Sequence, residues 1–441
     1  MHLADLHQRA SEAGVAGFRL LSREQLIAAI EAGGEQAAGP TEEAETAGGD
    51  AARPSRRRRR GGRRRRGAGE GDAGPGGAKP DGGDRPERPE ERAEEVETET
   101  EEVNGVLDRL PQGYGFLRLS GLGAAEGDVY VSASQIRRCE LRAGDEVSGP
   151  ARQPRRGEHH RALVRVGSVN GQEPEGERMQ FEDLTPIAPH RRLPLGDSPE
   201  LLVRAVDVLA PIALGQRVLI LAEPRSGRST LLRALASALT GGEVRLRVLL
   251  ADERPEEVTE WQRLLPEAEI VAAPADQEPA DQVRAAELAI GHAKRRAEAG
   301  EDVVVIVDSL SRLALGYRDP NRVKRLFGAG RELSEEGSGS LTMIATVLDS
   351  DARGAEVRAA LETTENVLLH LDAGLAERGI VPSLLVTEAK VSGETELRSP
   401  GELEGVRALR SELAPLEPAD AARRLADHIE DSASNSDLFG L

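Results

Sequence analysis

The chain has 441 residues, and its 77 acidic side chains against 58 Lys and Arg give a formal net charge of -19, a length that predicts two or three domains. A single cysteine, Cys139, cannot form an intramolecular disulfide, which excludes a cystine-stabilised secreted scaffold and favours a reducing compartment. Since no apolar run approaches the roughly 20 residues that span a bilayer, we expect a cytoplasmic protein with no membrane partner.

The first hundred residues divide into two segments. Residues 1–33 are predicted to form a small helical module, in which Ser22 and Gln25 have the spacing of a capping box. Residues 34–102 lose all hydrophobic periodicity and are predicted to be a disordered linker. It holds nine arginines between positions 56 and 66 and then an acidic block. A solvated spacer would explain the charges, but nine guanidinium groups favour an arm that neutralises RNA phosphates.

Residues 103–172 are predicted to form a small β-barrel of the OB type. Five short segments with β character are separated by glycines and charged turns, which is the pattern of such barrels. The segments are 105–107, 115–119, 128–131, 146–148 and 162–169.

Aromatic residues are concentrated in this barrel. Tyr114 and Phe116 stand at alternate positions of one predicted strand, so their rings share a face. Together with Tyr130 they make up a third of the nine aromatic residues in the chain. Stacking of a nucleic-acid base on such a ring contributes roughly 1–3 kcal/mol. Rings that merely close the barrel are the alternative, and the basic neighbour Arg118 favours RNA.

After a connector over residues 173–200, residues 201–441 alternate apolar strand runs with helices. This alternation predicts a mostly parallel α/β sheet covered on both faces, with ligands at the carboxyl ends of the strands. The expected strands are 217–221, 244–250, 269–272, 303–307, 341–347, 367–371 and 380–386, and helices are expected over 230–239 and 278–299.

The first of these strands leads into a candidate phosphate-binding loop. An eight-residue loop between a strand and a helix start near Thr230 presents backbone amides to an anion. Compared with the usual P-loop pattern, Gly227 and Ser229 are kept, Ala222 replaces the first glycine and Arg228 replaces the lysine. An ordinary strand-to-helix turn explains this loop equally well when it is considered alone.

Two further strand ends have acidic residues. Asp308 follows an apolar strand and is placed to hold Mg²⁺ through its water shell. Glu253 is a candidate base that positions an attacking water, and Arg254 is a candidate partner of the γ-phosphate. Helix capping or surface exposure would explain each residue singly. Three such ends on one sheet favour a nucleotide site.

These motifs resemble those of the bacterial transcription termination factor Rho family. The resemblance lies in residues 105–107, 113–118, 128–138, 252–260, 308–309, 313 and 325–329. It covers the helical module, the barrel and the ATPase domain, with the arginine-rich segment as an insertion. It implies a RecA-like P-loop ATPase fused to a cold-shock-like RNA-binding domain and assembled as a hexamer. Such a protein binds single-stranded RNA, hydrolyses ATP with Mg²⁺ as a translocase or helicase, and releases transcripts from RNA polymerase.

The resemblance also assigns residues to roles. RNA would contact Tyr114, Phe116, Arg118, Tyr130 and Glu158. The catalytic residues would be Glu253 and Arg254, and Ser229 and Asp308 would serve Mg²⁺. ATP would lie on Ala222, Glu223, Pro224, Arg225, Ser226, Gly227, Arg228, Ser229 and Thr230, with Val381 at the position of the adenine.

Departures from the family pattern are concentrated at the residues that would bind and hydrolyse ATP. Arg225 and Arg228 replace two lysines of the phosphate loop, and Val381 replaces the aromatic residue that stacks on adenine. Gly379 and Ser392 replace two arginines, one of them the finger of the neighbouring subunit. The nearest cations are Lys390 and Arg398, and these two and Arg410 are the candidates for a substitute finger. Residues 314–325 lack most of a Gly-rich RNA loop. The alternative is therefore a catalytically weakened paralogue that acts as an RNA-binding scaffold or regulator.

Overall fold

The computed structural model describes residues 100–441 except positions 275, 318 and 351. The predicted helical module at 1–33 and nearly all of the linker at 34–102 lie outside the described residues. Within the described part, no helix is both long enough and apolar enough to cross a membrane.

The first described domain is a closed barrel of five strands. Strand β1 pairs with β2, and the ladder continues through β3, β5 and β4 back to β1. Inward-facing side chains such as Leu107, Leu117, Val129 and Val147 are fully buried. This architecture confirms the predicted OB-type barrel. Its elements are β1 (Thr100–Arg109), β2 (Gly115–Arg118), β3 (Val129–Val131), α3 (Ala133–Arg138), β4 (Glu146–Arg152), β5 (Arg161–Leu163) and β6 (Ser168–Val169).

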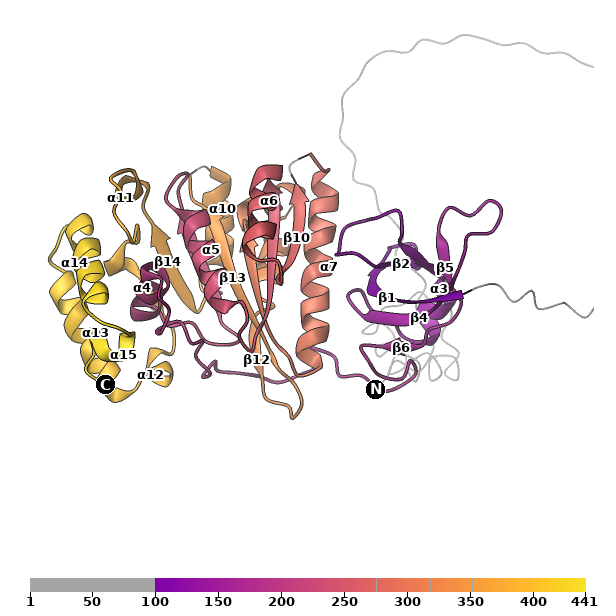
Figure 1. Cartoon of the computed structure of the whole chain (residues 1–441), viewed down its shortest axis with the longest axis horizontal. Coiled ribbons are helices and arrows are strands. Elements are labelled where there is room, and N and C mark those ends of the chain that lie inside the picture. The colour runs from indigo at the N-terminus through magenta and orange to yellow at the C-terminus, as the bar shows by residue number, and fades with distance from the viewer. Residues whose placement is uncertain (1–99, 275, 318, 351) are drawn as a thin grey trace, which may run out of the picture. The chain divides into compact units, whose positions relative to one another are not determined.

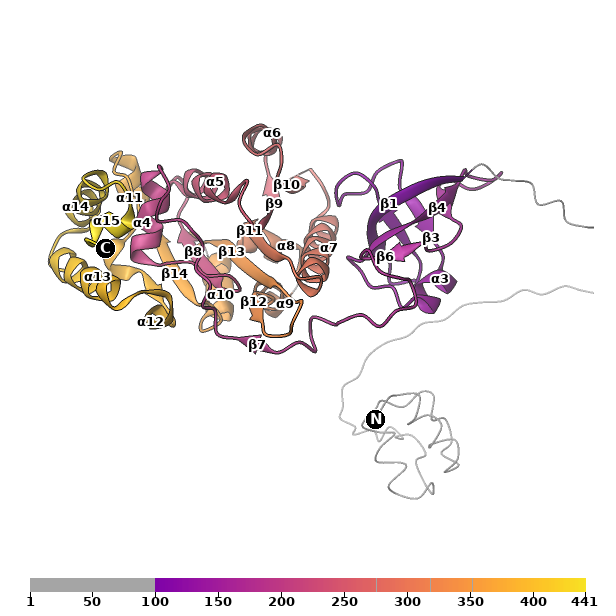
Figure 2. The same cartoon turned by 60° about the horizontal axis from the view of Figure 1, so that its bottom comes forward.

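The second domain is an α/β sheet with helices on both faces (Figures 1 and 2). Strands β10, β9, β11, β13, β8 and β14 are parallel neighbours in that order, and β15 is antiparallel at the edge. The strands are β7 (Pro186–Ile187), β8 (Arg217–Ala222), β9 (Arg245–Glu253), β10 (Glu269–Pro274), β11 (Asp302–Asp308), β12 (Arg331–Leu333), β13 (Ser340–Leu348), β14 (Val367–Leu371) and β15 (Lys390–Val391).

The helices of this domain follow the strands in the predicted alternation. Central strands such as β11 are buried along nearly their whole length, as expected for a parallel sheet covered on both faces. The helices are α4 (Leu201–Leu209), α5 (Arg228–Leu239), α6 (Pro255–Leu264), α7 (Pro279–Glu298), α8 (Leu310–Gly316), α9 (Pro320–Phe327), α10 (Ala352–Leu361), α11 (Ala373–Glu377), η2 (Val386–Glu388), α12 (Glu394–Leu397), α13 (Pro400–Leu413), α14 (Pro418–Glu430) and α15 (Asn435–Leu438).

The strand predicted at 380–386 is wrong. This segment pairs with β14 only through an isolated bridge between Leu384 and Leu371, and it continues into the 3₁₀ turn η2. Pro382 has no N–H to donate to a ladder, which is why an apolar run here does not extend the sheet.

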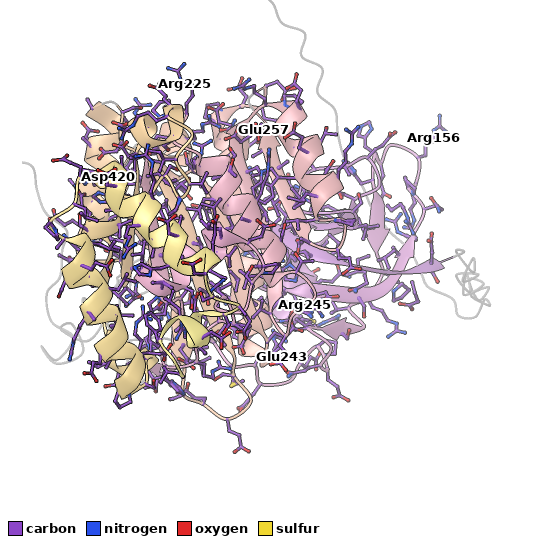
Figure 3. The ribbon with its side chains drawn as sticks, turned by 60° about the vertical axis from the view of Figure 1, so that its left-hand side comes forward. Arg156, Arg225, Glu243, Arg245, Glu257 and Asp420 are labelled. Atoms are coloured by element: carbon purple, nitrogen blue, oxygen red, sulfur yellow. The ribbon has the colours of Figure 1, made fainter. Side chains whose placement is uncertain are left out.

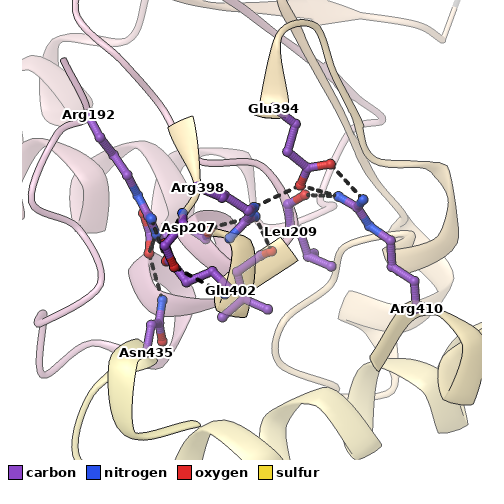
Figure 4. A network of polar contacts seen from close by, with 10 residues as sticks. Arg192, Asp207, Leu209, Glu394, Arg398, Glu402, Arg410 and Asn435 are labelled. Atoms are coloured by element: carbon purple, nitrogen blue, oxygen red, sulfur yellow. Dashed lines mark hydrogen bonds and ion pairs between the residues drawn. The ribbon is translucent and has the colours of Figure 1, made fainter. Parts of the chain in front are cut away.

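A buried polar network joins α4 to the C-terminal helices (Figure 4). Asp207 of α4 is fully buried and accepts hydrogen bonds from Arg192 and from Asn435 Nδ2, the latter at 2.8 Å. Arg398 donates to the carbonyl oxygen of Val208 at 2.6 Å and to Glu394 at 2.8 Å. The network fixes the helices that follow the sheet.

We predict that Asp207→Ala lowers the free energy of unfolding by about 3 kcal/mol, because it leaves buried donors of Arg192 and Asn435 without their acceptor. Urea unfolding followed by circular dichroism measures this. The control is Asp420→Ala, since Asp420 forms an exposed pair with Arg423 (Figure 3), and exposed pairs contribute at most about 1 kcal/mol. Equal losses in the two variants would contradict the prediction.

Candidate functional site

The candidate phosphate loop connects the carboxyl end of β8 to α5. Gly227 precedes α5 with φ of 88°, a conformation that favours glycine, and Arg225 also has a positive φ of 66°. The first turn of a helix presents N–H groups that lack intrahelical partners, so an anion is favoured there. The arrangement of strand, loop and helix start that the sequence predicted is present.

The loop residues differ in their exposure. Two residues of the loop, Ala222 and Ser226, are buried. The carbonyl oxygen of Ser226 accepts a hydrogen bond of 2.7 Å from Ser383 Oγ. Arg225 is exposed and points outward (Figure 3). A cavity of about 470 Å³ opens over the loop. Its lining includes Glu223, Pro224, Arg225, Gly227, Arg228, Ser229 and Thr230 from the loop, and Glu253, Arg254, Glu257 and Arg312 from neighbouring elements.

Two acidic side chains meet the arginine of the loop. Arg228 Nη2 lies 2.9 Å from Glu253 Oε1, and Arg228 Nε lies 3.2 Å from Asp308 Oδ1. Glu253 is the last residue of β9 and Asp308 the last of β11, and these strands are parallel neighbours. Their carboxyl ends therefore bring the two carboxylates to one place, as the parallel sheet predicts.

A second arginine, Arg312, binds the same carboxylate. Its Nη1 forms an ion pair with Glu253 and also donates to the carbonyl oxygen of Asp252 at 2.8 Å. Asp252 has a positive φ of 55°, which is uncommon for a residue other than glycine. This turn at the end of β9 directs Glu253 into the site, where it is nearly buried. Arg254 follows at the start of α6, is exposed, and lines the cavity.

Asp308 is the most enclosed acid of the site. Its side chain is 1% exposed, and burial raises its pKa while the Arg228 guanidinium acts to lower it. Thr346 Oγ1 of β13 donates to its Oδ1 at 3.0 Å.

The residues fit Mg²⁺ only together with a nucleotide. Among the described residues no group of three or more His, Cys, Asp or Glu side chains is arranged to hold a metal. Mg²⁺ in phosphoryl-transfer sites is typically held by one or two carboxylates, water and the substrate phosphates. Asp308 is one such carboxylate, covered by Arg228, and Ser229 contributes a hydroxyl to the cavity lining.

The position predicted for the adenine and the cations near the predicted arginine finger are outside the lining of this cavity. Val381 is half exposed, and it stands two residues before Ser383, whose hydroxyl holds the phosphate loop. Arg398 and Arg410 both pair with Glu394 inside the network of Figure 4. Lys390 is exposed. Of the three cations near the finger position, Lys390 alone is outside that network.

On the barrel, three aromatic rings form one platform. Tyr114, Phe116 and Tyr130 lie with centroids 5.6–6.0 Å apart. Phe116 of β2 stands directly opposite Tyr130 of β3 in the ladder. His160 packs edge-on against Phe116 at 4.9 Å. The rings are half-buried, so the alternative of rings that close the barrel core does not describe them. We call Tyr114, Phe116 and Tyr130 the aromatic platform, which His160 extends.

Arg118 lies against the Phe116 ring of the platform, and two aspartates balance its charge. It is 8% exposed and pairs with both Asp108 and Asp128. Burial acts to lower the pKa of Arg118, but hydrogen bonds to the two aspartates outweigh this and raise it. Its guanidinium lies 5.8 Å from the Phe116 ring centroid. This geometry favours support of the Phe116 ring over the direct base contact predicted from sequence.

Glu158 lies beside the platform in a cavity of about 760 Å³ that also includes Tyr130 and His160. Arg152 binds Glu158 through both terminal nitrogens, at 2.6 and 2.8 Å. These bonds, with a further one from the Arg155 N–H, lower the pKa of Glu158 to about 2. The carboxylate therefore stays ionised and fixed at the rim of the cavity.

Sequence reasoning missed Arg312 and His160. Arg312 is one of many arginines in the chain, and the one signal in the sequence was its position four residues after Asp308. His160 is in a loop 44 residues from Phe116, and the barrel closure alone brings the two rings together.

The fold and the two sites define a class of protein, an RNA-binding barrel joined to a nucleotide-binding α/β domain. Residues 103–175 match the family model described as Rho termination factor, RNA-binding domain. Residues 203–389 match that of the ATP synthase alpha/beta family, nucleotide-binding domain.

The particular family follows from relatives that match about three quarters of the chain. The chain is 39% identical to the transcription termination factor Rho of Aquifex aeolicus over 76% of this chain and 84% of that protein. It is 40% identical to that of Haemophilus influenzae over 76% and 86%, and 37% identical to that of Bacillus subtilis over 77% and 84%. The chain belongs to the transcription termination factor Rho family.

Proposed function

We propose that this chain is an RNA-dependent ATPase that moves along single-stranded RNA as a ring hexamer and releases transcripts from RNA polymerase. Membership of the Rho family and the nucleotide-binding domain support an ATP-hydrolysing enzyme. The observation that supports turnover most directly is that Glu253 and Asp308 lie at the carboxyl ends of two neighbouring parallel strands, beside the phosphate loop.

In this proposal the loop and the start of α5 hold the phosphates through backbone N–H groups. Arg225 and Arg254, both exposed at the cavity, contact the phosphate oxygens. Glu253 orients the attacking water and takes its proton. When bound, Mg²⁺ would neutralise charge that develops on the phosphate oxygens, and Asp308 and Ser229 are the residues that would hold it.

On the barrel, bases stack on Tyr114, Phe116 and Tyr130, with His160 extending the platform. Arg118 would stiffen Phe116 from below, and Glu158 would limit the shape of the base that enters the neighbouring cavity. The arginine-rich segment at 56–66 would add affinity that depends on salt.

One observation favours a second candidate function, an RNA-binding regulator with weak turnover. Arg228 and Arg312 both bind the carboxylate that would act on water. An arginine cannot replace the compact charge of a lysine between the β- and γ-phosphates without changing the geometry.

The experiment is ATP hydrolysis by the full chain with and without C-rich RNA. We expect RNA to raise the rate by roughly tenfold or more, which would require a barrier decrease of about 1.4 kcal/mol. RNA that binds the chain yet leaves the rate unchanged would reject the main proposal and support the second candidate.

A further inference from the structure

The arginine of the phosphate loop bridges two acids of the site. Through Nη2 it lies 2.9 Å from Glu253, and through Nε it lies 3.2 Å from Asp308. The side chains of Arg228, Glu253 and Asp308 are 13%, 7% and 1% exposed, so the contacts are screened little by water.

The charges of this cluster are balanced without any added ion. Two guanidinium groups, of Arg228 and Arg312, face two carboxylates, of Glu253 and Asp308. A buried carboxylate needs a cation or hydrogen-bond donors beside it, because leaving it alone in a dry site costs several kcal/mol. Arg228 supplies that cation to Asp308.

An arginine can form this bridge because its planar fork presents donors in two directions. A lysine ammonium is a single compact charge on a flexible stem. Arg228 contacts each carboxylate through a different nitrogen, and that geometry depends on the fork.

We propose that Arg228 is an internal counter-ion that occupies the place of the divalent cation beside Asp308 until nucleotide phosphates draw it away. The inference rests on the proposed function, in which Asp308 serves Mg²⁺ and the loop binds phosphates. Arg228 is a positioning residue for Asp308 and Glu253 in the nucleotide-free chain. A consequence is that the chain without nucleotide takes up a divalent cation poorly.

The experiment measures Mn²⁺ binding to the full chain at pH 8 without nucleotide, by electron paramagnetic resonance of the free ion. We expect Arg228→Gln to bind Mn²⁺ more tightly than wild type by roughly tenfold or more, because a cation in contact with Asp308 has been removed. Arg263→Gln is the matched control. It removes an equal charge from an exposed side chain in the last turn of α6, outside the cavity lining, so its affinity for Mn²⁺ should stay near that of wild type.

Two further variants keep the inference falsifiable. Arg228→Lys retains the charge without the fork, and we expect its Mn²⁺ affinity to fall between wild type and Arg228→Gln even if the latter folds poorly. The double variant Arg228→Gln, Asp308→Asn should lose the added affinity.

The outcomes separate this inference from the proposed function. If wild type and both single variants at Arg228 bind Mn²⁺ equally, while the double variant binds it more weakly, Asp308 holds the metal and the counter-ion inference alone is overturned. If the double variant binds Mn²⁺ as tightly as Arg228→Gln, the metal is not on Asp308, and the assignment of this site within the proposed function is also wrong.

Discussion

Replacing Glu253 with Gln should lower the RNA-stimulated rate of ATP hydrolysis by a factor of about 10² to 10⁴, the range that a positioned general base contributes. The amide keeps the size of the side chain but cannot accept a proton from water. Nucleotide affinity should not fall, because the phosphates are held by the loop and by arginines, and the variant removes one carboxylate that competes with them for Arg228. Steady-state hydrolysis and equilibrium nucleotide binding measure the two quantities separately.

The matched control is Glu257→Gln. Glu257 lines the same cavity but lies in the first turn of α6, where it pairs with Arg233 (Figure 3). This variant removes an equal charge from the cavity and should retain most of the rate. A Glu253→Gln rate equal to that of wild type would assign the proton transfer to another group, and equal losses in both variants would indicate a general charge effect.

The sheet and the barrel were predictable because their signals are local. Apolar runs of four to seven residues, the first four of them separated by helices, predicted the parallel strands, and the structure places β9 and β11 side by side so that Glu253 and Asp308 both reach Arg228. Alternation of Tyr114 and Phe116 predicted a shared face. In each case the periodicity of one strand sufficed.

What the sequence could not predict depends on which residues the fold brings together. Arg118 is a basic neighbour of the aromatic residues and was assigned to RNA, but β1 and the segment before β3 place Asp108 and Asp128 around it. In the sequence Arg398 is a candidate for the arginine finger. In the structure it is buried beside α12 and α13 and pairs with Glu394. Ion pairs between residues distant in sequence decide whether a cation is available, and a single sequence does not show them.

The same reasoning changes how the arginine substitutions are understood. From the sequence alone, Arg228 argues against catalysis because it replaces the lysine of the phosphate loop. Seen in the structure, its charge is shared between Glu253 and Asp308. The energetic question is therefore how strongly nucleotide phosphates compete with those two carboxylates for one guanidinium, since charge-assisted hydrogen bonds to either partner are of similar kind.

The double variant Tyr114→Ala, Phe116→Ala should weaken binding of C-rich RNA by roughly 30-fold or more, since two stacked bases lose at least about 1 kcal/mol each. The rings are half-buried at the surface of the barrel, while its core is made by aliphatic residues such as Leu107 and Leu117, so the barrel should still fold. Fluorescence anisotropy of a labelled oligonucleotide gives the dissociation constant.

The control exchanges the rings in place, as Tyr114→Phe, Phe116→Tyr, which keeps both stacking faces and should retain affinity within about threefold. Salt provides a second test, because the rings carry no charge. The slope of the logarithm of the affinity against the logarithm of salt concentration should be the same in wild type and in the alanine variant, since that slope counts phosphate contacts. Unchanged affinity in the alanine variant would place the RNA elsewhere, and the arginine block at 56–66 would then be the segment to test. A reduced slope with reduced affinity would mean that the platform positions cationic side chains and does not itself stack on the bases.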